Sequence, residues 1–132
     1  MPIGMDKPFY FLSGGTMMRN KYDMGNTKWT PVYRSETADY HPHLKERLES
    51  TFPGCVVIKN DPNRIQGIED FTVLYGKKWA TLEAKISEKA RRKPEPNQEH
   101  YVEQHKKMSY AAFVYPENED LVFEELREHF KD

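Results

Sequence analysis

Two acidic residues and a lysine in the middle of the chain have the types and spacing of a metal-dependent hydrolytic site. Asp70 precedes Glu83 with twelve residues between them, and Lys85 follows Glu83 at a distance of two. Side chains two apart on a strand point to the same face, so Glu83 and Lys85 are expected to lie together. Mg²⁺ takes few oxygen ligands from protein and leaves its other positions to water and phosphate. The two carboxylates therefore predict a metal site, with Lys85 placed to orient or deprotonate an attacking water and to stabilise charge on a phosphate.

The segment between these residues predicts a β-hairpin that brings them to one end. Residues 71–75 form an apolar run, Gly76-Lys77-Lys78 a turn, and residues 79–82 a second run that leads into Glu83. Asp70 stands where the first strand begins, next to the end of the second strand. The backbone carbonyl of Ala84 is a further oxygen ligand available there.

At these residues the chain resembles the PD-(D/E)XK nuclease superfamily, and within it the VRR-NUC group of phage and bacterial proteins. The resemblance extends from about residue 36 to residue 130 and includes Asp70, Glu83-Ala84-Lys85 and Pro96-Asn97-Gln98. It implies a restriction-endonuclease-like fold with an αβββαβ core, Mg²⁺ or Mn²⁺ as cofactor and DNA as substrate. Glu69 departs from the pattern, since the family usually has proline there; the change concerns the stiffness of the turn and not a ligand.

The resemblance also implies roles for individual residues. Metal binding would fall to Asp70, Glu83, Ala84 through its carbonyl, and Glu36 from the first helix. Catalysis would involve Lys85 together with the two carboxylates, supported by Gln98 at the start of a later helix. For Glu36, a solvated helix acid is an equally good interpretation of the sequence.

Basic and polar residues on both sides of the hairpin are candidates for contact with DNA phosphates. A polar loop precedes Asp70, and a basic loop from Ile86 to Pro96 leaves the proposed catalytic strand directly, where a phosphate backbone would lie. The candidates are Lys59, Arg64, Gln66, Lys89, Arg91, Arg92 and Lys93. A solvated charged face is the alternative interpretation of these residues.

The remaining elements predict an α/β domain over residues 33–132 with a mixed four-stranded sheet flanked by helices. Helical spacing over residues 36–52 is interrupted at Pro42, where the helix either kinks or begins. A strand with a buried Cys55 is expected at residues 55–59. After the hairpin we expect a helix capped by Asn97 and reaching about Met108, which turns His105 toward the sheet, and then a strand at residues 111–115.

The last helix is expected to serve only packing, through Leu121, Val122, Leu126 and Phe130. His41 and His43 are two apart and do not share a helix face, so a zinc site is not expected.

Length and composition indicate one globular domain. The chain has 132 residues, one cysteine and a net charge of −1, but its seven acids and two bases from Pro116 onward leave the first 115 residues at +4. No apolar run is long enough to span a membrane, so a cytoplasmic protein is expected. The resemblance implies a phage or bacterial host cell. Residues 1–32 are predicted to form an N-terminal extension, which is a hairpin on the core, a dimerisation arm or a partly disordered lead.

These observations predict a metal-dependent DNA endonuclease that selects DNA structure over base sequence, because little protein is left over for reading bases. Resolution of a junction needs two incisions, which suggests a homodimer on branched or nicked DNA, with Phe9 to Leu12 and Met17-Met18 as candidate contacts. The competing interpretation is a nucleic-acid-binding or protein-interaction module that has the nuclease fold without turnover.

Overall fold

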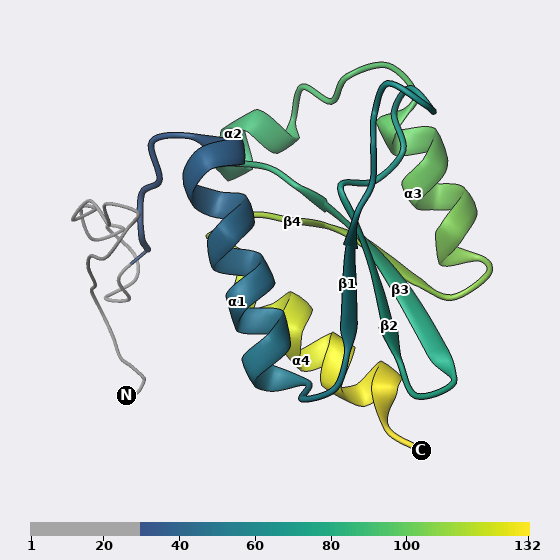
Figure 1. The fold of residues 1–132 in the computed structure, drawn as a ribbon. Coiled ribbons are helices and arrows are strands. Elements are labelled where there is room, and N and C mark those ends of the chain that lie inside the picture. Colours follow the sequence, from purple (N-terminus) through teal and green to yellow (C-terminus); the bar gives the residue numbers. More distant parts are fainter. Residues whose placement is uncertain (1–29) are drawn as a thin grey trace.

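The computed structural model describes residues 30–132, which form a mixed four-stranded sheet flanked by helices (Figure 1). The elements, in chain order, are η1 (Glu36–Tyr40, a π-helical turn), α1 (His41–Thr51), β1 (Val56–Lys59), β2 (Phe71–Tyr75), β3 (Lys78–Ala84), α2 (Glu88–Arg91), α3 (Gln98–Lys106), β4 (Tyr110–Val114) and α4 (Glu119–Phe130). The sheet order is β1-β2-β3-β4, antiparallel except for the parallel β3–β4 pair. The predicted fold class is confirmed at this level.

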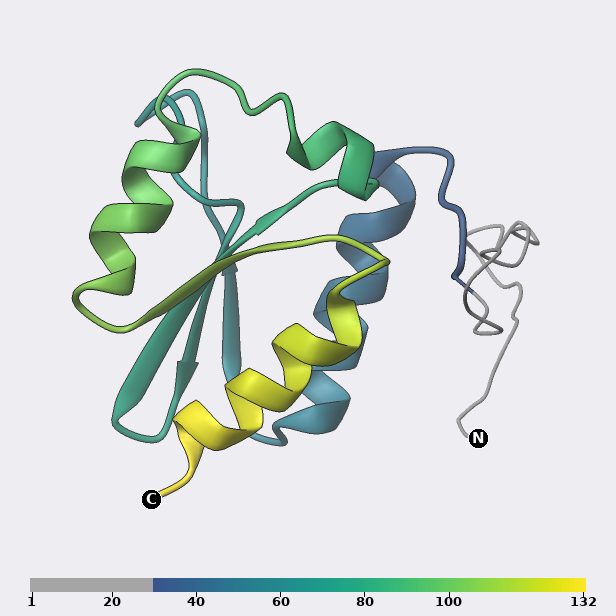
Figure 2. The same ribbon diagram turned by 180° about the vertical axis from the view of Figure 1, so that it is seen from behind.

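The two faces of the sheet carry different side chains and different helices. Helices α1 and α4 lie on one face and α3 lies on the other, as the front and back views show (Figures 1 and 2). Because side chains alternate along a strand, β3 turns Ala80, Leu82 and Ala84 into the large core under α1 and α4. Thr81 and Glu83 point to the opposite face, where α3 supplies only a small core around Val102 and Phe113. The polar residues of β3 therefore face α3.

The predicted hairpin is present, and its register sets the geometry of the candidate site. Strands β2 and β3 are joined by Gly76 and Lys77, and Gly76 has a φ of 62°, which glycine adopts without the clash of a side chain. Phe71 pairs with Leu82, so Asp70 is brought opposite Glu83. The expected crossover from β3 through α3 to a parallel β4 is also confirmed.

Of the two interpretations left open at Pro42, the second is confirmed: helix α1 begins at His41 with Pro42 in its first turn, where a missing amide proton costs little, and a separate π-helical turn precedes it. Two other local predictions were wrong in detail. Cys55 lies one residue before β1 and is only partly buried. The expected basic loop contains α2, because the Ser87 side chain accepts a hydrogen bond from the Ala90 amide (3.1 Å) and caps a short helix.

Two further predictions failed on side-chain direction. Asn97 does not cap α3 through its side chain; its backbone is left-handed, with a φ of 70°, and its side-chain amide donates to the Gln66 carbonyl (3.5 Å). Leu121 is not a packing residue, because it is 56% exposed on α4. Residues Phe9 to Leu12 and Met17-Met18 lie outside the described residues. Within residues 30–132, no helix is long and apolar enough to cross a membrane.

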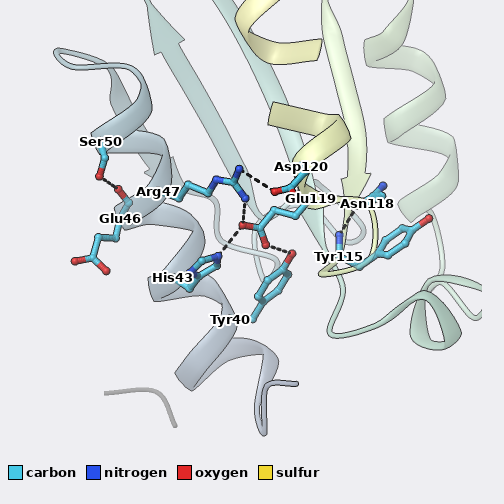
Figure 3. A network of polar contacts seen from close by, with 9 residues as sticks. All are labelled: Tyr40, His43, Glu46, Arg47, Ser50, Tyr115, Asn118, Glu119 and Asp120. Carbon is cyan, nitrogen blue, oxygen red and sulfur yellow. Dashed lines mark hydrogen bonds and ion pairs between the residues drawn. The ribbon is translucent and has the colours of Figure 1, made fainter. Parts of the chain in front are cut away.

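Helices α1 and α4 are joined by a buried carboxylate, so α4 does more than pack (Figure 3). Glu119, at the start of α4, accepts hydrogen bonds from Tyr40 (2.9 Å) and Arg47 (2.6 Å) and contacts the His43 ring (2.6 Å). Burial alone would raise the pKa of Glu119, but His43 and Arg47 lower it to about 2. A charge that is taken out of water is tolerated only with such partners. Glu119 thus fixes the two helices that cover the large core.

We predict that Glu119→Gln lowers the free energy of unfolding by roughly 2–3 kcal/mol, less than the full penalty for breaking a buried ion pair because Arg47 and His43 remain partly in water. Urea denaturation at pH 7 measures the change. Glu124→Gln, on the exposed side of the same helix, is the matched control and should stay near the wild-type value. Equal stability of the two variants would show that Glu119 is not a structural link.

Candidate active site

Asp70 lies at the end of the hairpin with its carboxylate held by the neighbouring strand. Its Oδ2 accepts a hydrogen bond from the Ala84 amide (2.9 Å) and lies 3.5 Å from His41 Nε2, a charge contact longer than a well-formed hydrogen bond. Lys59 Nζ is 3.9 Å from Oδ1. The amide and carbonyl of one residue in a strand point to the same edge, so the Ala84 carbonyl also faces the Asp70 side.

These contacts keep Asp70 ionised although it is largely buried. Burial by itself would raise the pKa of Asp70, but the His41 ring, the Ala84 amide and the Lys59 ammonium together hold it below its usual value. Asp70 therefore presents a fixed negative charge at the end of β2.

Glu83 lies opposite Asp70 on β3, and its pKa is raised where that of Asp70 is lowered. It is only 2% exposed, its Oε2 accepts a hydrogen bond from Gln98 Nε2 (2.8 Å), and its Oε1 is buried with no hydrogen-bond partner among residues 30–132. Burial, and then the charge of Asp70, raise the pKa of Glu83 to about 9, while Lys85 acts in the opposite direction. Two carboxylates this close cannot both ionise cheaply, so Glu83 holds a proton unless a cation is added.

Lys85 and Glu36 complete the polar cluster at the end of β3. The Lys85 side chain is buried, and its amide donates to the Val114 carbonyl (2.8 Å), which keeps the residue aligned with β4 beyond the end of the strand. Glu36 comes from η1, and its Oε2 accepts a hydrogen bond from the Ile86 amide (2.9 Å). The charge of Glu36 contributes to the raised pKa of Glu83. The predicted acid of the first helix thus lies at the end of β3.

Gln98 reaches Glu83 because the chain before α3 is packed tightly against the loop before Asp70. Its side-chain oxygen accepts from the Glu95 amide (2.8 Å), which leaves the amide group to donate to Glu83. Gly67 has a φ of 87°, and a Cβ there would come within 2.5 Å of Asn97 Cβ. Only glycine permits this approach, which places the start of α3 beside the hairpin.

The residues present fit a divalent cation. Within residues 30–132, no group of three or more His, Cys, Asp or Glu side chains is gathered as a ready-made metal site. The two facing carboxylates and the Ala84 carbonyl form an oxygen-only set of the kind that Mg²⁺ or Mn²⁺ takes while it keeps several waters. The unpartnered Oε1 of Glu83 and the repulsion between Glu83 and Asp70 are the observations that favour such an ion.

The predicted DNA-binding residues separate into three groups. Arg91 is used within the fold: its guanidinium lies 3.8 Å above the Phe113 ring and pairs with Glu99 (3.1 Å). Lys59 belongs to the site through its contact with Asp70. The others are exposed on the α2 segment or on the loop before Asp70, and they are Arg64, Gln66, Lys89, Arg92 and Lys93.

Two residues at or beside the site have contacts that the sequence analysis missed. His41 is buried beside Asp70, with its ring edge-on to Phe71 at 5.1 Å between centroids. Glu69, noted only as a departure from proline, is fully buried and contacts His105 (2.7 Å). The sequence feature that could have indicated a role for Glu69 was an acid next to the candidate ligand Asp70, at a position where proline was expected. No spacing rule pointed to His41.

Comparisons with protein-family models, with curated proteins and with solved structures give no match to this chain. The chemistry of the site therefore has to be argued from its own residues.

We predict that the metal-free protein loses stability as the pH rises from about 4.5 toward 9. The folded state holds the Glu83 proton up to a pKa of about 9, whereas the unfolded state releases it near 4.5, so folding becomes less favourable across this window. The midpoint of thermal unfolding between pH 5 and 8.5, in a chelating buffer, measures the slope.

Glu83→Gln should flatten this slope, and so should a saturating concentration of Mn²⁺, because each removes the need for the proton. Glu103→Gln, an exposed acid on α3, should leave the slope unchanged. The same slope in Glu83→Gln as in the wild type would contradict the assignment.

Proposed function

We propose that this protein is a divalent-metal-dependent endonuclease that hydrolyses phosphodiester bonds in DNA through a PD-(D/E)XK-type site. One observation carries the proposal: Asp70 and Glu83 face each other on adjoining strands, with a buried Lys85 at the same end. Their electrostatics support it, because a carboxylate whose pKa is raised to about 9 beside an ionised Asp70 is a site prepared for a cation.

Different residues of the chain have different roles in the proposed reaction. Asp70, Glu83 and the Ala84 carbonyl would hold the metal, which when bound supplies Lewis-acid activation of the phosphate and of water. Glu83 would give up its proton to solvent on binding the cation, while the hydrogen bond from the Gln98 amide would hold its carboxylate in place. Lys85, held by the β4 backbone, orients the attacking water and stabilises the charge that develops on the phosphate.

Glu36 is the candidate for an additional acidic contact. Its hydrogen bond to the Ile86 amide fixes it at the end of β3, close enough to affect the pKa of Glu83. It would adjust the charge of the site or hold a ligand through water.

The proposed substrate is branched or nicked DNA, and the proposed active form is a homodimer. One Asp70 and Glu83 pair cuts one strand, whereas a junction with two-fold symmetry needs two incisions, which a symmetric dimer supplies. The short domain described here also offers little surface for reading bases in a groove. A non-catalytic module on the same fold is the alternative, and the paired carboxylates with Lys85 argue against it.

We predict that Asp70→Asn and Glu83→Gln each reduce cleavage by about 10²-fold or more, the scale on which electrostatic stabilisation of a transition state acts, and leave DNA affinity within a few fold. Chelation of the wild type should have the same effect. Cleavage of labelled four-way junction, nicked duplex and linear duplex, with and without Mn²⁺, measures this.

Glu103→Gln serves as the matched control, since it removes an exposed carboxylate far from the hairpin in sequence. Full activity in the two site variants, or in a chelating buffer, would overturn the nuclease proposal. Linear duplex cut as readily as the junction, by a protein that sediments as a monomer near 15.6 kDa, would overturn the structure-selective dimer alone.

The α2 segment gives a separate prediction about DNA binding. Replacing Lys89, Arg92 and Lys93 together with Ala should reduce the log–log salt dependence of affinity for duplex DNA by about 0.9 for each phosphate that the variant no longer neutralises. Lys106 and Lys107, at the opposite end of α3, provide the control pair. A slope that is the same in the α2 variant and in the wild type would mean that this basic surface is only solvated. Arg91→Ala should act on stability, because Arg91 packs on Phe113.

A further inference from the structure

A second buried carboxylate lies directly beside the candidate active site. Glu69 is fully buried, and its two oxygens lie 2.9 and 2.7 Å from His105 Nδ1. Thr81 donates a hydrogen bond to Glu69 Oε2 (2.9 Å). We call Glu69, Thr81 and His105 the Glu69 cluster. It joins the segment before β2 to the middle of β3 and to the last turn of α3.

The His105 ring has a fixed direction within this cluster. It lies between Trp79, edge-on at 6.0 Å, and Tyr101, stacked at 6.0 Å, and its side chain is 17% exposed. An ionised carboxylate only accepts hydrogen bonds, so in a pair with an ionised Glu69 the donor is His105 Nδ1. A buried carboxylate is tolerated only when such donors meet it, and an apolar residue would cost less at this position. The cluster therefore serves geometry more than stability.

The backbone of Glu69 and Asp70 is held from the other side by Asn60. Asn60 donates from its side chain to the Glu69 carbonyl (3.0 Å) and to Thr72 (2.9 Å), and from its amide to the Asp70 carbonyl (2.8 Å). Because Glu69 and Asp70 are adjacent, the contacts of the Glu69 side chain and the Asn60 donors together restrict where the Asp70 backbone lies relative to the Ala84 amide.

Helix α3 is attached to the same short segment at two places. Its start is packed against Gly67, and its last turn is bound through His105 to Glu69. Gln98, which donates to Glu83, lies between these two attachments. A shift of α3 would therefore move Gln98 away from Glu83, and a shift of Glu69 would move Asp70.

We propose that the Glu69 cluster is a positioning device. It holds Asp70 in place through the adjoining backbone, and through α3 it holds Gln98 against Glu83. The positions of Asp70 and Glu83 relative to each other are thereby fixed. The proposal rests on the nuclease function proposed above. Glu69, Thr81 and His105 do not themselves touch the reacting atoms. A residue that fixes a metal-ligating carboxylate through hydrogen bonds commonly affects metal affinity or activity by about 10–100-fold when it is removed. A displacement of about 1 Å at the reacting centre has an effect of about 10²-fold.

The test compares two matched pairs of variants in the full-length chain. His105→Leu removes the donor to Glu69, whereas His105→Asn keeps an N–H near the position of Nδ1. Thr81→Val removes the second donor without changing the shape of the side chain, and Thr81→Ser restores the hydroxyl. Gln104→Leu, an exposed neighbour of His105 on α3, is the control for changes on this helix.

Three quantities are measured for each variant. They are kcat for DNA cleavage at saturating Mn²⁺, the Mn²⁺ concentration that gives half-maximal cleavage, and the NMR signals of the Gln98 side-chain amide in the metal-free protein. We expect His105→Leu to lower kcat or to raise the half-maximal Mn²⁺ concentration by about 10–100-fold, and to shift the Gln98 amide signals. Thr81→Val should do the same to a smaller extent, and His105→Asn, Thr81→Ser and Gln104→Leu should remain near wild type.

The amide signals separate this proposal from the nuclease function. If the wild type does not cleave DNA, the nuclease function fails, but a shifted Gln98 amide in His105→Leu still supports the positioning role. A folded His105→Leu variant could instead show wild-type kcat, unchanged Mn²⁺ dependence and unmoved Gln98 signals. That result would overturn the positioning role and leave the Glu69 cluster with a packing role only. If His105→Leu does not fold, the Thr81→Val and Thr81→Ser pair decides by the same criteria, since it removes only one hydrogen bond.

Discussion

Two carboxylates placed side by side at the end of a hairpin are the constraint on which the rest of this structure depends. Asp70 and Glu83 repel each other when both are ionised, and burial makes that repulsion stronger because water no longer screens it. Asp70 is kept charged by the Ala84 amide and by the nearby His41 and Lys59 side chains. The repulsion is therefore relieved at Glu83, which holds a proton. Such a pair is unfavourable for folding alone, and this is the observation behind the cation site proposed above.

The two faces of the sheet are packed differently. Under α1 and α4 the sheet buries a continuous apolar core, and Glu119 links the two helices with a set of donors that leaves its charge satisfied. The face toward α3 has a small apolar core and is instead rich in polar contacts, including those of Gln98 and His105. The large core allows the opposite face to tolerate an electrostatically unfavourable pair.

The basic residues that follow Lys85 in the sequence do not all lie on one exposed surface. The basic run after Lys85 looked uniform in sequence, but the short helix α2 turns Arg91 inward onto Phe113 and leaves Arg92 exposed on its other side. Neighbours in a helix point about 100° apart, so a charged run contributes only some of its members to any one surface. The same reasoning separates His41, which contacts Asp70, from His43, which contacts Glu119.

The sequence by itself determined the hairpin, the order of the elements, the mixed four-stranded sheet and the approach of Asp70 to Glu83, because alternation, turn residues and spacing act over short stretches of chain. Only the tertiary structure decided which polar groups meet from distant segments. Glu69 meets His105 across 36 residues, and His43 meets Glu119 across 76. These pairings depend on how helices pack on the sheet, and a local pattern contains no record of that packing. The pairing of buried charges is therefore what the folded structure adds, because the absence of water forces each of them to find a partner.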